Sequence, residues 1–377
     1  MAHSKMQPLR LTEDQVRMLR ARAQRLTPQQ GGKKPSVSQI LQEVCGVQAQ
    51  ELPAAALAIR NRSSGLAASD VDSARLQERS VVRTWCMRGT LHLISVEDFG
   101  WLLPLLGPKL LAGSRRRLAQ MGLDEAAVAK AVPIIGEVLA SRGPLTRAEI
   151  ARELSQRSGI QAEGQARIHL VYQAAMNGIL CCGPERGNEP AYALVEDWVG
   201  PLHPLPRAQA LKELCLRYLR AYGPAEPRDL AAWSGLSLSE ARRGWEQVAD
   251  LLKEVDLNRR QMWVLTEQTG WLDESPPPTP TVRLLPRYDA YLLGYANRDL
   301  AVAPEFAKRI NRGGGIIHPA LLVDGRAVGT WETKRRRDSL SVVIEPFEEL
   351  DGSYLAGIRA EVSDLGRFLG VEAKLAG

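Results

Sequence analysis

A short pattern occurs twice in the middle of the chain and constrains its fold more than any other feature. The stretch at 143–151 reads GPLTRAEIA, and the stretch at 223–231 reads GPAEPRDLA. Each follows an apolar helical stretch and begins a short amphipathic helix, after which a second helix and two short strands are expected. This is the order of a winged helix, a motif that commonly docks on DNA. The repeat therefore predicts two tandem winged helices.

A third, looser copy of the same order precedes these two. Its expected helices lie at 12–23, 36–47 and 54–59, and its wing at 81–94. The two strands of that wing meet at Arg88-Gly89, where glycine tolerates a tight turn. In the later copies the last helix and the wing strands are expected at 166–177, 179–182 and 192–194, and at 239–249, 252–255 and 261–265.

Beyond a proline-rich stretch at 273–280 the composition changes. Consecutive prolines hold an extended form, so this stretch predicts a stiff linker. Short β-rich runs follow at 282–285, 318–323, 327–331 and 340–344, with a final helix near 362–369. We therefore expect an α+β protein of three tandem winged-helix motifs and a C-terminal β-barrel. The expected domains are 1–130, 131–203 and 204–272 for the winged helices, 273–281 for the linker and 282–377 for the barrel.

Basic residues are clustered along the chain. The formal net charge is +6, and arginines gather at 115–117, 242–243, 259–260 and 335–337. Such clustering favours a polyanionic partner. For any single cluster, a solvated helix face or loop tip is an equally good interpretation.

The cysteines and the apolar runs bear on the compartment. Five cysteines form no C-x-x-C pair, and adjacent Cys181 and Cys182 suit neither an ordinary disulfide nor a zinc site. The first five residues lack the apolar core of a signal peptide, and runs such as 101–106 are too short to span a bilayer. We expect a cytoplasmic protein with no metal, no cofactor and no membrane contact.

Two amides, Gln48 and Gln50, stand one residue apart at the end of a helix-like apolar run. Amides do not titrate at ordinary pH, but their carbonyls can orient a water molecule. That chemistry suits a leaving group that is already cationic. Q-x-Q alone is a weak pattern, and taken in isolation it is better explained as two polar side chains at a helix end.

Longer strings give this pair a context. They are the Q-A-Q motif itself, RTWCMRGTLHL at 83–93, PRYDAYLLGY at 286–295, and VDG and VGTW within 323–331. In that order they resemble the bacterial HTH_42 superfamily of winged-helix DNA glycosylases over most of the chain. With Gln50 rather than aspartate at the last motif position, the chain looks like the AlkZ-like branch. Members of that branch protect antibiotic producers from their own DNA-alkylating products.

The resemblance implies three tandem winged helices and a β-barrel arranged in a C shape around DNA. It also implies hydrolysis of the N-glycosidic bond of N7-alkylated purines, including those in interstrand crosslinks, with Gln48 and Gln50 as the catalytic pair. Elementary chemistry agrees, because N7 alkylation makes the base cationic and strong acid catalysis unnecessary. Two amide dipoles can then place the water and steady the developing sugar cation. Unmodified bases should be poor substrates, since they need a general acid.

Several residues are candidate DNA contacts, each with a structural alternative. Lys334, Arg335, Arg336 and Arg337 lie between two expected strands and should form a protruding basic hairpin. Arg88, His92 and Arg287 are further candidates, although His92 could satisfy a core hydrogen bond. The motif around Arg287 could equally lock the barrel onto the helices. Glu51 could act as a base or be ion-paired, and Trp85 and Trp331 are expected core anchors.

Two other function classes fit the same features. A winged-helix transcriptional regulator would usually dimerise on a palindrome, and the chain has no heptad run. A general nucleic-acid-binding protein with a barrel module is the other. We therefore expect a monomeric glycosylase whose partner is double-stranded DNA containing alkylated purines.

Overall fold

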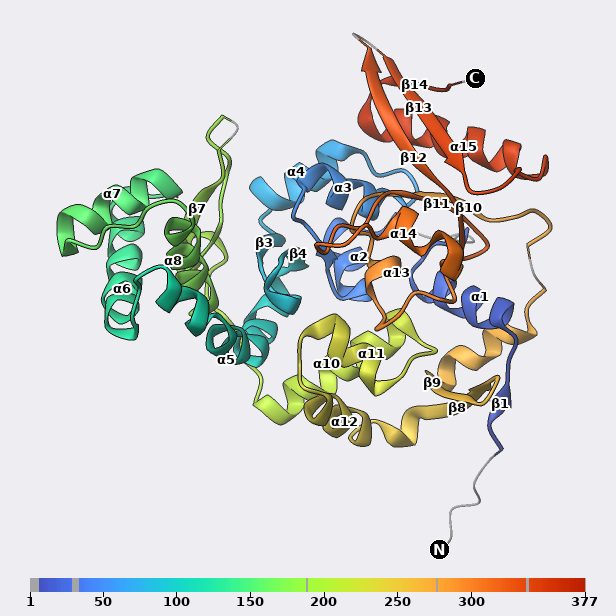
Figure 1. Ribbon diagram of the computed structural model, residues 1–377, viewed down its shortest axis with the longest axis horizontal. Coiled ribbons are helices and arrows are strands. Elements are labelled where there is room, and N and C mark those ends of the chain that lie inside the picture. Colours follow the sequence, from blue (N-terminus) through green and yellow to red (C-terminus); the bar gives the residue numbers. More distant parts are fainter. Residues whose placement is uncertain (1–6, 29–33, 188, 276, 337–338, 377) are drawn as a thin grey trace, which may run out of the picture. The chain divides into compact units, whose positions relative to one another are not determined.

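A computed structural model describes residues 7–28, 34–187, 189–275, 277–336 and 339–376. The first five residues, Pro276 in the linker and Arg337 in the basic hairpin therefore lie outside the described part. The chain has a mixed α+β fold and forms two compact units (Figure 1). The first unit contains Met1–Val71, Leu211–Trp233 and Ser237–Gly377, and the second contains Asp72–Ala210 and Ser234–Leu236.

The second unit holds the first copy of the repeat. Helix α7 begins at the capping box that Thr146 and Glu149 form, as the sequence predicted. Strand β6 pairs antiparallel with β7, and the short β5 pairs with the other edge of β7. The elements of this unit are β3 (Val81–Trp85), η1 (Met87–Gly89), β4 (Leu91–Ser95), α5 (Val96–Gln120), α6 (Glu125–Arg142), β5 (Leu145–Thr146), α7 (Arg147–Ser158), α8 (Gln165–Met176), β6 (Leu180–Cys182), β7 (Ala191–Leu194) and α9 (Val195–Trp198).

The second copy has the same order of elements. Helices α10 (Arg207–Tyr222), α11 (Pro227–Ser234) and α12 (Leu238–Glu246) precede the antiparallel strands β8 (Leu252–Leu257) and β9 (Arg260–Leu265). An isolated bridge between Ala225 and Trp263 takes the place of the β5–β7 pair. The two-residue strand β1 (Leu9–Arg10) adds to β8 in parallel. The short helices η2 (Ala249–Leu251) and η3 (Thr266–Asp273) flank the wing.

The N-terminal helices begin where the sequence predicted and end differently. Thr12 and Ser36 each form a capping box, at α1 (Glu13–Ala23) and α2 (Val37–Val44). The prediction of a second helix reaching residue 47 was wrong, because Cys45 adopts the left-handed conformation at φ 55° and ends α2. A two-residue strand, β2 (Val47–Gln48), follows. Then come α3 (Leu52–Arg60) and α4 (Ala68–Leu76), of which α4 was not predicted.

The C-terminal β-rich region is a five-stranded sheet in the order β10-β11-β12-β13-β14. Its strands are β10 (Val282–Leu285), β11 (Ala320–Val323), β12 (Arg326–Arg336), β13 (Ser339–Pro346) and β14 (Glu372–Leu375), with α13 (Ala290–Leu293), η4 (Pro304–Phe306) and α14 (Ala307–Ile310) between β10 and β11. The sheet is a curled half-barrel rather than the predicted barrel. Helix α15 (Tyr354–Leu369) packs apolar residues against it (Figure 1).

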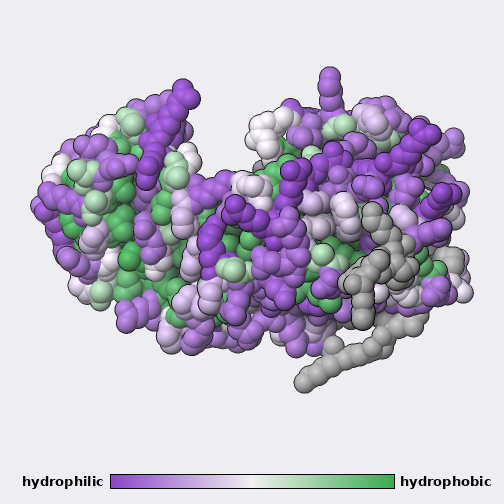
Figure 2. Space-filling view, turned by 90° about the horizontal axis from the view of Figure 1, so that it is seen from below, coloured by the Kyte–Doolittle hydropathy of each residue, from purple (hydrophilic) through white to green (hydrophobic). Residues whose placement is uncertain are grey.

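Buried apolar side chains form separate cores in the first unit. One core packs α15 against β10 and β13, and includes Trp331. Trp85 in the second unit is also buried, so both tryptophans are core anchors as predicted. Hydrophilic residues make up most of the face seen in Figure 2. Among the described helices, none is long and apolar enough to cross a membrane.

Candidate active site around Gln48 and Gln50

The two amides stand on the short segment between α2 and α3, which contains the strand β2. Burial alternates along it: Val47 and Ala49 are buried at 1% and 0% exposure, whereas Gln48 is partly exposed and Gln50 is exposed. Only Val47 and Gln48 form a strand, and the chain bends at Gln50 and Glu51. Both amides reach the accessible surface, while Val47 and Ala49 face the core. The segment can extend because Cys45 and Gly46, with φ of 55° and 86°, turn the chain out of α2.

Glu51 follows the amide pair immediately and is ion-paired. Its Oε1 lies 2.8 Å from Nη1 of Arg287, and both side chains are partly exposed. This is the salt-bridged alternative expected for Glu51. Glu51 also precedes α3, whose N-terminal end carries a partial positive charge. The residue next to the amide pair is thus a carboxylate held by a guanidinium.

A buried ion pair fastens the far end of α3 to the same loop. Two guanidinium nitrogens of Arg62 donate to the two carboxylate oxygens of Asp289, at 2.9 and 2.8 Å, and both side chains are fully buried. Gln24 accepts a further hydrogen bond from Arg62 at 2.8 Å. Since Arg287 and Asp289 bind opposite ends of α3, the loop between them fixes the helix that follows the amides.

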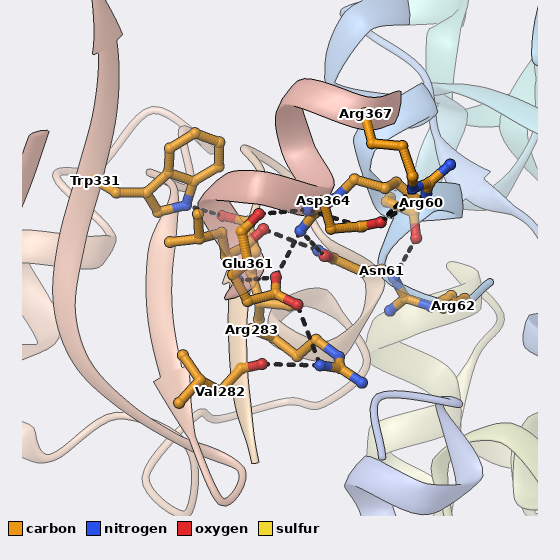
Figure 3. Close-up of polar contacts among 12 residues, drawn as sticks. Arg60, Asn61, Arg62, Val282, Arg283, Trp331, Glu361, Asp364 and Arg367 are labelled. Carbon is orange, nitrogen blue, oxygen red and sulfur yellow. Dashed lines mark hydrogen bonds and ion pairs between the residues drawn. The ribbon is translucent and has the colours of Figure 1, made fainter. Parts of the chain in front are cut away.

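A second polar cluster joins the end of α3 to the C-terminal sheet (Figure 3). The guanidinium of Arg60 is 1% exposed and donates to Oε2 of Glu361 on α15 at 2.6 Å. Glu361 also accepts from Arg283 and from the backbone amide of Leu284, at 3.1 and 2.9 Å. Asn61 donates to the Leu284 carbonyl at 2.9 Å. Every oxygen of this buried carboxylate therefore has a partner, as burial of a charge requires.

Two buried tyrosines, Tyr222 of α10 and Tyr295, support the end of α2. The hydroxyl of Tyr222 donates to the Val44 carbonyl at 3.2 Å, and that of Tyr295 donates to the Tyr222 carbonyl at 3.0 Å. Gly294 lies against Tyr222 so closely that a Cβ there would be 2.3 Å from a ring carbon. Most of the motif at 286–295 thus has the structural role that was one of its two interpretations. Arg287 and Tyr288 remain partly exposed.

The candidate DNA contacts of the second unit lie at the wing turn. Arg88 is half-buried in η1, at φ 56°. His92 is 2% exposed, and its Nδ1 lies 2.9 Å from the Thr90 carbonyl. Burial, reinforced by the positive charge of Arg88, lowers the pKa of His92 to about 3. A buried neutral imidazole favours the core hydrogen-bonding alternative for His92 over a contact with phosphate.

The basic hairpin belongs to β12 and β13, which project beyond the other strands of the sheet (Figure 1). Lys334 and Arg335 are exposed. Arg336 pairs through its backbone with Ser339, at the last described rung of the ladder. Lys334 also lies 3.2 Å from Glu332, a pair in which both side chains are well exposed. An exposed pair of this kind leaves the lysine available to phosphate.

No group of three or more potential metal ligands occurs among the described residues. All five cysteines are buried. An open pocket of about 730 Å³ lies elsewhere in the first unit, beside α11, α12 and the β8–β9 wing. Both signs of charge line it, and none of the sequence-predicted site residues does.

Sequence reasoning missed the residues that hold α3 in place. Arg60, Arg62 and Glu361 lie outside the motif strings. The pairs Arg60–Glu361 and Arg62–Asp289 join residues 301 and 227 positions apart along the chain. Charged residues ending an apolar helix look like solvated groups. Of the residues in these pairs, only Asp289 lies in a motif string, and a structural role was one of the two interpretations of that motif.

Known proteins resemble this chain over most of its length. The family model for "DNA glycosylase AlkZ-like" matches residues 41–368. An "Interstrand DNA cross-link repair glycosylase" from Streptomyces sahachiroi is 30% identical over 359 residues, which cover 90% of this chain and 92% of that protein. The solved structure of Streptomyces sahachiroi DNA glycosylase AlkZ matches with a TM-score of 0.80 and 28% identity, covering 98% of this chain and 100% of that one.

The fold and these similarities define the class of protein: it is a DNA glycosylase. More particularly, the chain belongs to the AlkZ-like DNA glycosylase family. Family membership separates it from the regulators and general nucleic-acid-binding proteins that the winged-helix pattern alone left open.

Proposed function

We propose that the protein hydrolyses the N-glycosidic bond of N7-alkylated purines in double-stranded DNA, including purines within interstrand crosslinks. The observation that carries the proposal is the burial pattern along 47–50, in which Val47 and Ala49 face the core while Gln48 and Gln50 reach the accessible surface. The relative from Streptomyces sahachiroi, by its name a crosslink repair glycosylase, supports the choice of substrate.

The proposed reaction needs little from the protein. The C1′–N9 bond breaks, its electron pair neutralises the cationic base, and a water oxygen bonds to C1′ and loses its proton to solvent. The amide carbonyls of Gln48 and Gln50 orient that water and stabilise the sugar cation through their dipoles. A monofunctional enzyme, which leaves an abasic site, follows because the water is the nucleophile.

The remaining expectations form part of the same proposal. The protein acts as a monomer, and three winged-helix segments with the predicted boundaries hold the duplex in a C-shaped channel. Lys334, Arg335 and Arg88 contact phosphate. Arg287 holds Glu51, so its contribution to DNA binding is secondary.

Incubation with a duplex carrying one N7-methylguanine tests the proposal. Alkali should cleave the strand at the modified site after treatment with wild type but not after Gln48→Ala or Gln50→Ala, while both variants still bind DNA. Gln247→Ala is the matched control, because Gln247 is an exposed amide on the protein surface. Full activity in both motif variants would exclude the amide pair, and release of undamaged purines at a similar rate would exclude the specificity.

A further inference from the structure

The segment Arg312–Ile316, here called the glycine loop, has no role in the hydrolysis proposed above. It is anchored tightly at both ends. Ile310 and Ile317 are each 1% exposed and belong to the same core. The amide of His318 donates to the Ile310 carbonyl at 2.9 Å, and an antiparallel bridge joins Asn311 to Ile317. The loop is therefore a short protrusion on a fixed base.

The three glycines of the loop have positive φ angles, and no protein atoms pack around them. Gly313, Gly314 and Gly315 have φ of 100°, 63° and 77°, values that residues with side chains adopt at a cost. A Cβ built on any of them would meet nothing within 4 Å. Close packing against the protein thus does not explain the absence of side chains. A bare backbone of this kind allows close approach by a large ligand.

The tip of the loop combines an apolar side chain with positive charge. Ile316 is 39% exposed, although isoleucine is usually buried. Between Glu305 and Asp324 the sequence contains no acidic residue, whereas Lys308 and Arg312 are exposed on this stretch. Proteins that deform DNA commonly insert apolar wedges such as isoleucine between base pairs and use arginine or lysine on the adjacent phosphates.

The loop lies near the candidate active site. Ile310 and Ile317, which anchor the loop, belong to a core against which Tyr288 packs, and Tyr288 follows Arg287 in the chain. Arg287 is the residue that binds Glu51 at 2.8 Å, next to Gln50. The base of the loop and Arg287 therefore lie in one region of the first unit, and Arg287 in turn contacts the residue that follows Gln50.

We propose that the glycine loop enters duplex DNA beside the modified base, with Ile316 inserted between base pairs and Arg312 on a backbone phosphate. Insertion unstacks the neighbouring base and opens the path to C1′ for the amide-held water. The inference rests on the proposed function for its substrate, but unstacking itself requires no hydrolysis.

Fluorescence of 2-aminopurine tests the insertion directly, because this base becomes brighter when it is unstacked. The probe is a duplex with 2-aminopurine next to one N7-methylguanine, at protein concentrations that saturate binding. Wild type should raise the fluorescence, and Ile316→Ala should lose most of the rise and at least about fivefold of the single-turnover excision rate. Ile316→Leu should restore both, since leucine can also act as a wedge.

Leu355→Ala is the matched control, because Leu355 is also a large exposed apolar residue, 43% exposed, on α15. It should behave as wild type in both measurements. Equal fluorescence and equal excision for Ile316→Ala and wild type would overturn the proposal and point to a protein or RNA partner for the loop. Circular dichroism of Ile316→Ala should match wild type, since the exposed side chain leaves the core intact.

Failure of the proposed function would look different. If Gln48 and Gln50 have no catalytic role, Gln50→Ala keeps full excision, and the fluorescence rise still depends on Ile316. If the wedge is wrong, Gln50→Ala loses excision while Ile316→Ala keeps it. The two readouts therefore separate the two proposals.

Discussion

At the scale of single residues, the site depends on uncharged amides beside one neutralised carboxylate. Gln48 and Gln50 carry no charge to bury, and Glu51 is held by Arg287 at 2.8 Å. A carboxylate that acts as a general base contributes about a hundredfold or more to the rate. A paired carboxylate next to a cationic leaving group has no such task.

Glu51→Gln should therefore keep excision of N7-methylguanine within about threefold of wild type, because the water is oriented by the amides and not deprotonated by Glu51. Single-turnover kinetics across pH 5 to 9 measures this. A loss near the hundredfold range, with the pH dependence removed, would make Glu51 the base after all. Glu348→Gln, at an exposed position, serves as the control.

The burial of His92 makes the stability of the protein depend on pH. Burial and Arg88 lower its pKa to about 3, so the folded state holds the neutral imidazole. In the unfolded chain the imidazole takes up a proton below about pH 6.5. The stabilising effect is therefore complete above that pH and is lost as the pH falls toward the folded pKa. At pH 5 the loss is about 2 kcal/mol.

His92→Gln should flatten the fall in the free energy of unfolding between pH 7 and pH 4, because glutamine does not titrate. Urea denaturation at several pH values measures the slope. His203→Gln, at an exposed histidine of the same unit, should leave the slope as in wild type. A slope equally steep in His92→Gln would show that other groups set the acid sensitivity.

Among the elements, sequence patterns located most helices and strands but misplaced the end of α2, the helix that precedes the amide pair. The apolar spacing of 40, 41, 44 and 47 fits a helix through Val47, yet α2 ends at Val44. The cause is a left-handed conformation at Cys45, a residue type with no special preference for it, so propensity gave no warning. By contrast, Thr146 and Ser36 start their helices as predicted, because capping boxes are local chemistry.

The buried pair of Arg62 and Asp289 sets the position of α3 and should be costly to break. Arg62→Met leaves the Asp289 carboxylate in a fully buried place without its counter-charge, which typically costs about 3–5 kcal/mol. Urea unfolding of the whole protein measures the loss. Lys374→Ala breaks the exposed pair with Glu372 and should cost less than about 1 kcal/mol.

A second variant separates the ion pair from simple packing. Replacing both partners, as Arg62→Met with Asp289→Leu, removes the uncompensated charge and should recover part of the lost stability. If the single variant is as stable as wild type, the pair has no role in holding α3.

For the whole molecule, the sequence predicted the repeated order of elements and the β-rich C-terminal region. It did not predict that the C-terminal sheet stays an open half-barrel. Strands β10 and β11 were located by composition, whereas β14 and the early turns of α15 were missed. Gly357 in α15 looks like a helix breaker, but its lack of a side chain lets α15 pack against Val282. Such close approaches depend on contacts between distant residues, which no local pattern records. The compact units likewise combine segments far apart in the chain.

The net charge of +6 is a property of the whole chain, and its contribution to DNA binding should be measurable at the basic hairpin. Lys334 and Arg335 are exposed on β12, where duplex phosphates can reach them. Each phosphate that a cation neutralises releases counterions and adds about 0.9 to the slope of log K against log salt. The double variant Lys334→Ala with Arg335→Ala should therefore lower that slope by about 2 and weaken binding to damaged and undamaged duplex alike.

Fluorescence anisotropy from low to moderate salt measures these slopes. Arg359→Ala with Lys212→Ala removes two exposed cations from α15 and α10 and should leave the slope unchanged, because neither residue belongs to the β12–β13 hairpin. Single-turnover excision at saturating protein should also be unchanged in the hairpin variant, since phosphate contacts position the duplex without taking part in hydrolysis. An unchanged slope in the hairpin variant would mean that the duplex passes the hairpin without contact, and the basic residues elsewhere on the chain would then supply the electrostatic attraction.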